Sequence, residues 1–331
     1  MAHKIFDTTC SDQKLLLSIC ILSYNQPEEI QRVLISLQVQ VMVGVEIVIL
    51  DDSENDETEI LARRFSATLP IRYFHGKKKG VDEAVLFLTH AAKGDFIWWM
   101  GDDEITSGGV YNVLKIIEAD KKINFIWANY CLSNNPTLAV DFASDQYFDS
   151  KNQLLEKAGA GLGFVSAVIF RREVVQSGLD EARHYIGTQF VSLFIILYAI
   201  TRPGKLFYLR GPIVICHFAT SEEIKADVIK KDGLIHNQAF QVFGINFSNI
   251  VNRFSDSFDP IVLKRALKKS FGQMWRGVLV GTAGGWDTTQ GKRIKLIRNF
   301  WYFPESWIAV ILFCLPKKLL SYLYRGYKLF N

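Results

Sequence analysis

The 331-residue chain is poor in cysteine and has no long apolar segment. Its five cysteines are odd in number, scattered along the chain and without a Cys-x-x-Cys spacing. This pattern argues against a disulfide framework or a zinc site, and for a reducing compartment. No stretch reaches the roughly 18 uninterrupted apolar residues of a transmembrane helix. Residues 1–14 are polar and do not resemble the apolar segment of a signal peptide. We therefore expect a cytoplasmic protein.

Two common nucleotide-binding signatures are also missing. The chain has no Gly-x-Gly-x-x-Gly after its first expected strand and no Gly-Lys-Ser/Thr loop, which excludes the Rossmann dinucleotide site and the P-loop. A phosphate-bearing ligand would therefore have to be held by a metal ion and basic side chains. The run Lys77–Lys79 is one candidate, although charge runs are more often solvated loops. The net charge of only +4 does not indicate nucleic acid as a partner.

Apolar segments of strand length alternate with helical patterns through the first hundred residues. A composition of 49% hydrophobic and 22% charged residues supports a substantial core. Four strand–helix alternations predict an α/β fold with a right-handed, parallel sheet. The expected strands are 15–22, 45–50, 71–74 and 96–100, and the helices between them are 28–37, 57–65 and 81–92. Beyond them we expect a helix over 110–119, strands over 125–131, 164–170 and 213–217, a buried helix over 190–200 and a polar flap over 141–157.

Carboxylates follow directly on two of these strands. Asp51 and Asp52 end the second strand, and Asp102, Asp103 and Glu104 follow the fourth. Ligands of open α/β sheets bind at this rim. Adjacent carboxylates repel one another, so a bound Mg²⁺ or Mn²⁺ is a physical reason for placing them together. The alternatives are a solvated acidic turn for the second group and helix capping for the first.

Three segments in this order resemble the family-2 glycosyltransferases, which have the GT-A (nucleotide-diphospho-sugar transferase) fold with a mostly parallel central sheet. They are Ser-Ile-Cys-Ile-Leu-Ser-Tyr-Asn at 18–25, Glu-Ile-Val-Ile-Leu-Asp-Asp-Ser at 46–53, and the Ala-Lys-Gly-Asp-Phe-Ile and Gly-Asp-Asp-Glu motifs within 92–104. The last looks like the family's metal-binding "DxD" region. Gly-Val-Asp at 80–82, taken with Trp-Trp-Met-Gly-Asp-Asp at 98–103, most resembles the branch that adds sugars to bacterial O-antigen repeats. Abequosyltransferase-like enzymes, which would use CDP-abequose, are the nearest group.

The resemblance implies roles for individual residues. Asp103, helped by Asp102, would ligate Mn²⁺ or Mg²⁺, and His217 would complete the metal or diphosphate site unless it is an ordinary core or edge histidine. The nucleotide-binding candidates are Ser23, Tyr24, Asn25, Asp51, Asp52, Lys79, Gly80, Asp82, Gly101 and Asp102.

The catalytic base is the weakest part of the resemblance. Inverting members usually carry a Glu-Asp pair at the start of a helix after the strand that we expect over 164–170. This chain has Thr188 and Gln189 there, and neither side chain can act as a general base. Asp180 and Glu181 are the nearby carboxylates and thus our catalytic candidates. The sequence therefore leaves both an inverting and a retaining mechanism open.

The domain organisation follows from the same comparison and from a shift in composition. We expect a catalytic domain over 1–220, with nucleotide-sugar binding in 15–110 and the acceptor side in 111–220. A helical, amphipathic extension would follow over 221–331. Residues 292–331 contain eight basic residues against one acidic residue, a net charge of +7 that leaves −3 for the rest. Interleaved aromatics make this segment a candidate for binding a membrane surface. The alternative is a helical cap over the catalytic domain.

The function implied is a metal-dependent transfer of one sugar from a nucleotide-diphosphate sugar. The acceptor would be an undecaprenyl-diphosphate-linked oligosaccharide of O-antigen, lipopolysaccharide or a related surface polysaccharide. The enzyme would be peripheral at the cytoplasmic face of the bacterial inner membrane. A nucleotidyltransferase is the alternative enzyme class, but it would normally show a Gly-rich, basic signature where Ser23–Asn25 stand. A non-catalytic sugar-nucleotide-binding relative is the other alternative. The Asp102–Asp103 pair argues against it, and the missing Glu-Asp pair argues for it.

Overall fold

The computed structural model separates into two compact units, Met1–Phe218 and Ala219–Asn331. The structure describes residues 3–9, 14–40, 42–77, 80–140, 142–217 and 245–268, with single positions between 301 and 322. The first unit contains every predicted site residue, and Lys79 is the one among them that lies outside the described residues.

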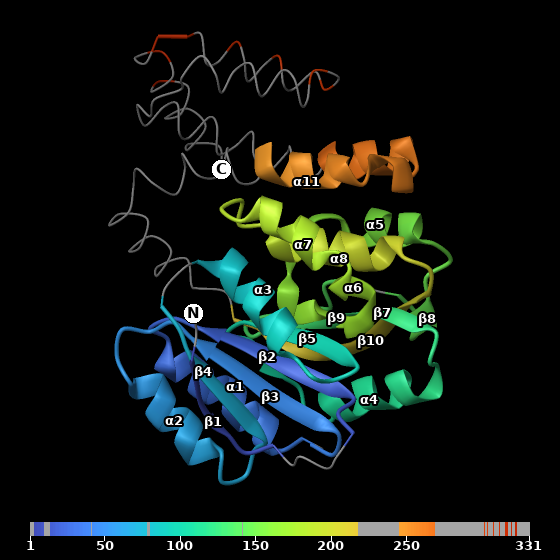
Figure 1. Ribbon diagram of the computed structural model, residues 1–331. Coiled ribbons are helices and arrows are strands. Elements are labelled where there is room, and N and C mark those ends of the chain that lie inside the picture. Colours follow the sequence, from blue (N-terminus) through green and yellow to red (C-terminus); the bar gives the residue numbers. More distant parts are fainter. Residues whose placement is uncertain are drawn as a thin grey trace. The chain divides into compact units, whose positions relative to one another are not determined.

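Four parallel strands form the centre of the first unit, as the sequence predicts. They are β2 (Leu17–Ser23), β3 (Val45–Asp51), β4 (Ile71–His75) and β5 (Phe96–Met100), in the sheet order β4-β3-β2-β5. The helices that connect them are α1 (Pro27–Gln38), α2 (Glu57–Phe65) and α3 (Val81–Ala91) (Figure 1). Because the four strands are parallel, their carboxyl ends lie at one edge of the sheet.

The remaining strands make the sheet mixed. Strand β9 (Val168–Arg171) runs antiparallel between β5 and β7 (Ile123–Leu132), and β10 (Lys205–Cys216) runs parallel to β7. Short strands pair antiparallel at its margins: β1 (His3–Asp7) with β4, and β6 (Glu104–Ile105) and β8 (Gln146–Tyr147) with β10. The other described elements of this unit are α4 (Gly109–Ala119), α5 (Lys151–Ala158), α6 (Arg172–Gln176), α7 (Leu179–Ala182), α8 (Val191–Thr201), η1 (Gly159–Gly163), η2 (Val165–Ala167) and η3 (Arg183–Tyr185).

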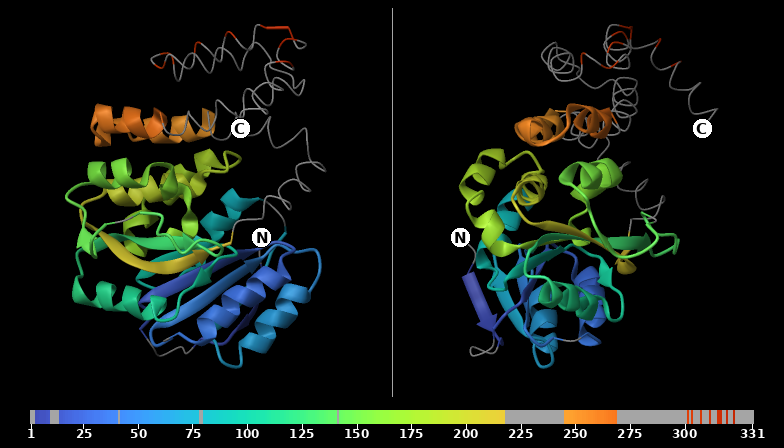
Figure 2. Two further views of the ribbon diagram at one scale, coloured as in Figure 1. Left: turned by 180° about the vertical axis from the view of Figure 1, so that it is seen from behind. Right: turned by 90° about the vertical axis from the view of Figure 1, so that its right-hand side faces the viewer.

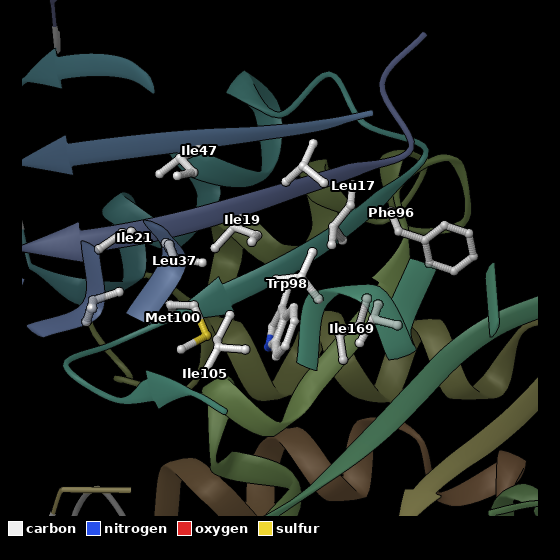
Figure 3. Close-up of a cluster of buried hydrophobic side chains, with 14 of the residues drawn as sticks. Leu17, Ile19, Ile21, Leu37, Ile47, Phe96, Trp98, Met100, Ile105 and Ile169 are labelled. Carbon is white, nitrogen blue, oxygen red and sulfur yellow. The ribbon is translucent and has the colours of Figure 1, made fainter. Parts of the chain in front are cut away.

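Helices cover both faces of this sheet. The apolar faces of α1, α2 and α4 pack with alternate strand residues, such as Ile19 and Trp98, into one buried cluster (Figure 3). On the opposite face, α3 packs on β2 and β3, and α8 packs on β7 and β9 and against α3 (Figure 2). Helix α8 is almost entirely buried and apolar, as expected for a core helix. The predicted GT-A-like layering is thus present.

Three segments differ from the sequence-based expectations. The strand expected over 164–170 begins only at Val168, because residues 165–167 form η2. The polar N-terminal segment contributes strand β1, which extends the sheet beyond β4. The stretch predicted to be a flap over 141–157 is largely regular, because it contains β8 and most of α5. Helix α5 forms there because the Ser150 hydroxyl accepts a hydrogen bond from the Gln153 N–H, and because Leu154 and Leu155 are buried. The flap prediction was wrong because a polar average concealed these apolar positions.

The second unit is described in part. It contains α11 (Phe247–Arg253), η5 (Ser255–Ser257) and helical residues 260–268. Most of the predicted membrane-associating tail over 292–331 lies outside the described residues. Among the residues that are described, no helix is both long and apolar enough to cross a membrane.

Candidate nucleotide and metal site

The predicted site residues gather at the carboxyl ends of the central strands. Ser23 at the end of β2 pairs in register with Asp51 at the end of β3, which in turn pairs with His75 at the end of β4. On the other side of β2, Ile21 pairs with Met100, the last residue of β5. The two acidic groups of the sequence therefore share one sheet edge, separated by strand β2.

Asp51 and Ser23 point into the protein. Asp51 is fully buried, and its carboxylate accepts hydrogen bonds from the Tyr73 hydroxyl at 2.6 Å and from the Ser53 N–H at 3.1 Å. Burial and this bond raise the pKa of Tyr73 well above its usual range, so the phenol stays a donor. The buried Ser23 hydroxyl lies 3.3 Å from that of Thr58. The Asp51 and Ser23 side chains therefore brace the strand ends, and their contacts with a nucleotide stay predictions.

Asn25 and Tyr24 join the loop after β2 to the loop after β3. Asn25 has a φ of 52°, an uncommon conformation for a residue with a side chain. Its N–H donates to the Ser53 hydroxyl at 2.8 Å, and its side-chain oxygen accepts from the Glu54 N–H at 3.2 Å. The Tyr24 hydroxyl donates to Glu54 at 3.4 Å. The two loops therefore form one connected surface.

Asp52 is the residue of the first acidic pair that faces a cavity. The cavity has a volume of about 450 Å³ and includes Gly76, Lys77 and Phe87 in its walls. A Cβ atom at position 76 would come within 2.2 Å of an Asp52 carboxylate oxygen, so only glycine allows this carboxylate its position. The predicted nucleotide contact of Asp52 stays a prediction, which this cavity supports.

The far wall of the cavity comes from a distant part of the sequence. Arg183 of η3 and Ile186 line the cavity together with residues of β3 and α3 and with the chain that follows β4. Arg183 is not among the residues predicted from the sequence, because no local pattern relates it to Asp52, which lines the same cavity. The lining carries two basic side chains, Lys77 and Arg183, beside the carboxylates of Asp52 and Glu83. The basic side chains can attract anionic groups of a ligand.

The second acidic group, Asp102, Asp103 and Glu104, leads from the end of β5 into β6. Asp102 and Glu104 are partly exposed, whereas Asp103 is only 4% exposed. Burial raises the pKa of Asp103 above its ordinary value, and the nearby charge of Asp102 adds to this. Hydrogen bonds from Ser166 and from the backbone N–H of His217 offset part of the shift. A buried carboxylate with a raised pKa favours a cationic partner.

His217 lies beside this group, as the sequence predicted for a further ligand. Its backbone N–H donates to Asp103 Oδ1 at 3.1 Å, and its ring Nε2 lies 2.8 Å from Glu104 Oε1. The Nε2 atom is buried, and its alignment with Glu104 does not make a hydrogen bond. The pairing of Ile215 on β10 with Glu104 on β6 brings the two side chains together. Sequence analysis named Glu104 but gave it no role.

The donor set fits a hard divalent cation. No group of three or more potential ligands is assembled among the described residues. Mg²⁺-type sites, however, commonly use one or two carboxylates and complete their shell with water and substrate phosphates. Asp102 and Asp103 supply neighbouring carboxylates of this kind, and the His217 imidazole lies next to Glu104. The ligand roles of all three residues stay predictions.

The remaining nucleotide candidates are placed differently. Gly80, with a φ of 93°, is exposed just before α3. Gly101 donates its N–H to the Ser166 hydroxyl at 3.2 Å and so ties β5 to η2. Asp82 is buried, and its carboxylate accepts hydrogen bonds from three backbone N–H groups that precede and begin α8. These bonds do not support the predicted direct contact between Asp82 and nucleotide.

The two catalytic candidates lie on α7, which packs against α8 and η3. Asp180 is fully exposed and lies 3.7 Å from Arg183. Glu181 is partly exposed. The structure therefore places these carboxylates near the Arg183 wall of the cavity rather than beside Asp103. Their catalytic role stays a prediction.

Comparisons with known proteins agree with this geometry. Residues 18–179 match the family described as Glycosyl transferase family 2. The chain is 26% identical to abequosyltransferase RfbV of Salmonella typhimurium over 61% of this chain and 66% of that protein. It is also 26% identical to WfgD of Escherichia coli, a UDP-Glc:alpha-D-GlcNAc-diphosphoundecaprenol beta-1,3-glucosyltransferase, over 44% of this chain and 57% of that protein. The matches span less than two thirds of either relative.

A solved structure shares the fold. The crystal structure of S. aureus TarS 1-349 in complex with UDP-GlcNAc superimposes with a TM-score of 0.56 at 12% identity. The superposition covers 94% of this chain and 92% of that chain. At this identity the likeness establishes the fold alone.

Proposed function

Since residues 18–179 form a glycosyl transferase family 2 domain with a GT-A-like fold, we propose that this chain transfers a single sugar from a nucleotide-sugar donor. The proposed acceptor is a lipid-linked oligosaccharide of O-antigen synthesis. The main support is the placement of Asp52 and Asp103 at the ends of two strands with one strand between them. Two strand spacings are about 10 Å, which suits a ligand with a base at one end and a diphosphate at the other.

The cavity residues and the second acidic group have separate roles in the proposed reaction. Asp52 accepts a hydrogen bond from the edge of the base in the cavity. Lys77 and Arg183, which line the same cavity, attract the negatively charged donor. Asp102, Asp103 and His217 would hold Mn²⁺ or Mg²⁺, and such an ion supplies positive charge that stabilises a leaving nucleoside diphosphate. Burial of Asp103 keeps water away from its carboxylate and strengthens its attraction to a cation.

The donor is proposed to be CDP-abequose or a related nucleotide sugar. The support is the 26% identity with an abequosyltransferase. The second relative, WfgD, supports an acceptor that carries its glycan on undecaprenyl diphosphate. A chain that uses such an acceptor works at the membrane surface, and we place this one peripherally at the cytoplasmic face of a bacterial inner membrane.

A thermal-shift screen tests the proposal. We expect one of UDP, CDP, GDP and dTDP, and CDP first, to raise the unfolding midpoint with Mn²⁺ present. A ligand at a hundred times its Kd stabilises by about 2.7 kcal/mol. Asp52→Ala should abolish the shift, and Glu118→Gln, an exposed position on α4, should leave it unchanged. The proposal fails if no nucleotide shifts the midpoint, or if Asp52→Ala responds as the wild type does.

The C-terminal tail is proposed to bind anionic membranes. Several of its described apolar side chains are exposed, among them Trp307 at 49% and Tyr322 at 72%, whereas Phe303 is buried. We expect the full chain to co-sediment with vesicles that contain phosphatidylglycerol and to be released by salt. A basic residue near such a surface contributes about 1 kcal/mol. The double substitution Lys317→Glu with Lys318→Glu removes two such contributions and should therefore weaken vesicle binding by about thirtyfold or more. Equal binding to neutral vesicles would contradict an electrostatic role.

A further inference from the structure

Asp82 joins two parts of the chain that are more than a hundred residues apart. It lies in the first turn of α3 and is 5% exposed. Its Oδ2 accepts hydrogen bonds from the N–H groups of Gly187 at 2.9 Å and Gln189 at 2.8 Å. Its Oδ1 accepts from the N–H of Val191, the first residue of α8, at 3.1 Å. Hydrogen bonds to a carboxylate are stronger than those between neutral groups.

The segment that Asp82 holds has an unusual backbone. Gly187 has a φ of 88°, and Gln189 has a φ of 65°. The left-handed conformation is strained for a glutamine. Such a conformation persists when its surroundings determine it, and here the N–H of the strained residue donates to Asp82. The carboxylate thus specifies a loop shape that the loop's own sequence does not favour.

The helix that carries Asp82 and the residues just before the segment that it holds both contribute to the lining of the cavity beside Asp52. Helix α3 contributes Glu83 and Phe87, which follow Asp82 within five positions. The clamped segment is preceded by Arg183 and Ile186, which form the far wall. Asp82 is itself absent from the cavity lining. We therefore expect the width of the cavity to depend on the hydrogen bonds of Asp82, which lie outside the lining itself.

We propose that Asp82 is a positioning residue for donor binding, which fixes the segment from Arg183 to Gln189 against α3 so that the cavity keeps its binding-competent shape. This inference rests on the proposed function. The residue acts through the loop rather than on the nucleotide. When the competent shape is only partly populated, the apparent Kd rises in inverse proportion to its population. Loss of the clamp should therefore weaken nucleotide binding while the first unit remains folded.

The test measures the Kd of the best nucleoside diphosphate with Mn²⁺ by calorimetry, at a temperature where every variant is folded. Asp82→Ala removes all three acceptor contacts, and we expect its Kd to rise about tenfold, as for a competent population of one in ten. Asp82→Asn keeps one acceptor oxygen, and we expect an intermediate rise. Hydrogen exchange at the amides of Gly187, Gln189 and Val191 should accelerate in step with the Kd.

Ser150→Ala is the matched control. The Ser150 side chain also accepts a backbone N–H at a helix N-terminus, that of α5, which contributes nothing to the cavity lining. It should lower the unfolding midpoint and leave the Kd unchanged. An unchanged Kd in Asp82→Ala, with faster exchange in the loop, overturns the inference, as does an equal Kd rise in Ser150→Ala. If the wild type binds no nucleoside diphosphate, the proposed function fails and this inference fails with it.

Discussion

Asp103→Asn is expected to lower kcat/KM by at least a hundredfold, roughly the cost of removing one stabilising group from a transition state. The asparagine keeps an oxygen that can accept the His217 N–H, whose bond to Asp103 Oδ1 is 3.1 Å long. It lacks the negative charge that a cation would pair with. The loss of kcat/KM should therefore arise from the missing negative charge at position 103 rather than from a change in side-chain shape.

The same substitution is expected to raise the unfolding midpoint when metal and nucleotide are absent. Burial raises the pKa of Asp103, so the folded state holds this proton more tightly than the unfolded chain does. The associated stability is present below the unfolded pKa and is lost as pH rises through the folded pKa. At neutral pH the ionised carboxylate therefore destabilises the fold, and a neutral asparagine removes this cost.

Both expectations are checked by measuring kcat/KM and the thermal unfolding midpoint of Asp103→Asn and of the wild type at pH 7.5 and pH 5. The stability difference between Asp103→Asn and the wild type should shrink at the lower pH, where the wild-type carboxyl begins to take up its proton. Glu118→Gln, which also removes one carboxylate but from an exposed position on α4, should change neither quantity. A variant that is less stable at both pH values, or as active as the wild type, would show that Asp103 is an ordinary structural aspartate.

Arg72→Met is expected to lower the free energy of unfolding by about 3–5 kcal/mol, the usual cost of removing one partner of a buried ion pair. Arg72 on β4 donates to Glu46 on β3 at 2.7 Å, and the Glu46 side chain is fully buried. The Ser18 hydroxyl and the Lys93 N–H each donate to the other Glu46 oxygen at 2.6 Å. Without the guanidinium, the buried carboxylate would retain hydrogen bonds but no counter-charge.

A second substitution separates charge from packing. In Arg72→Met with Glu46→Gln, the uncompensated charge is gone, so most of the lost stability should return, as judged by urea unfolding of all three proteins. Glu46→Gln alone would leave the arginine with the carboxylate of Asp7 at 3.6 Å as its counter-charge and should also be destabilising. If the double variant is as unstable as Arg72→Met, the arginine stabilises the sheet through its hydrocarbon contacts rather than through its charge. The nucleotide Kd should be unaffected, because this pair is absent from the cavity lining and makes none of the bonds that Asp82 makes to the segment before α8.

Local sequence patterns were enough to predict the central sheet and the edge at which the site lies. Apolar runs such as Phe96–Met100 and the helical spacing between them are local patterns, and residues within a few positions decide them. The carboxyl ends of consecutive parallel strands then meet at one edge by geometry alone. The placement of Asp52 and Asp103 on that edge was therefore predictable, as was the core helix over 190–200. The flap over 141–157 was not, because the two buried leucines of α5 lie within a polar stretch.

The tertiary structure alone decided what each polar residue does at that edge. Asp51 and Asp52 are neighbours of the same type, yet Tyr73 and Ser53 hold the first inside while the second faces the cavity. Asp82 serves the backbone before α8, and Arg183 reaches the cavity from the far end of the unit. Apart from the bond between Asp51 and Ser53, these roles depend on partners far away in the sequence, as with Asp51 and Tyr73 at a separation of 22 and Asp82 and Gln189 at a separation of 107. Chain folding sets such pairings, and no pattern within a short window of sequence contains them.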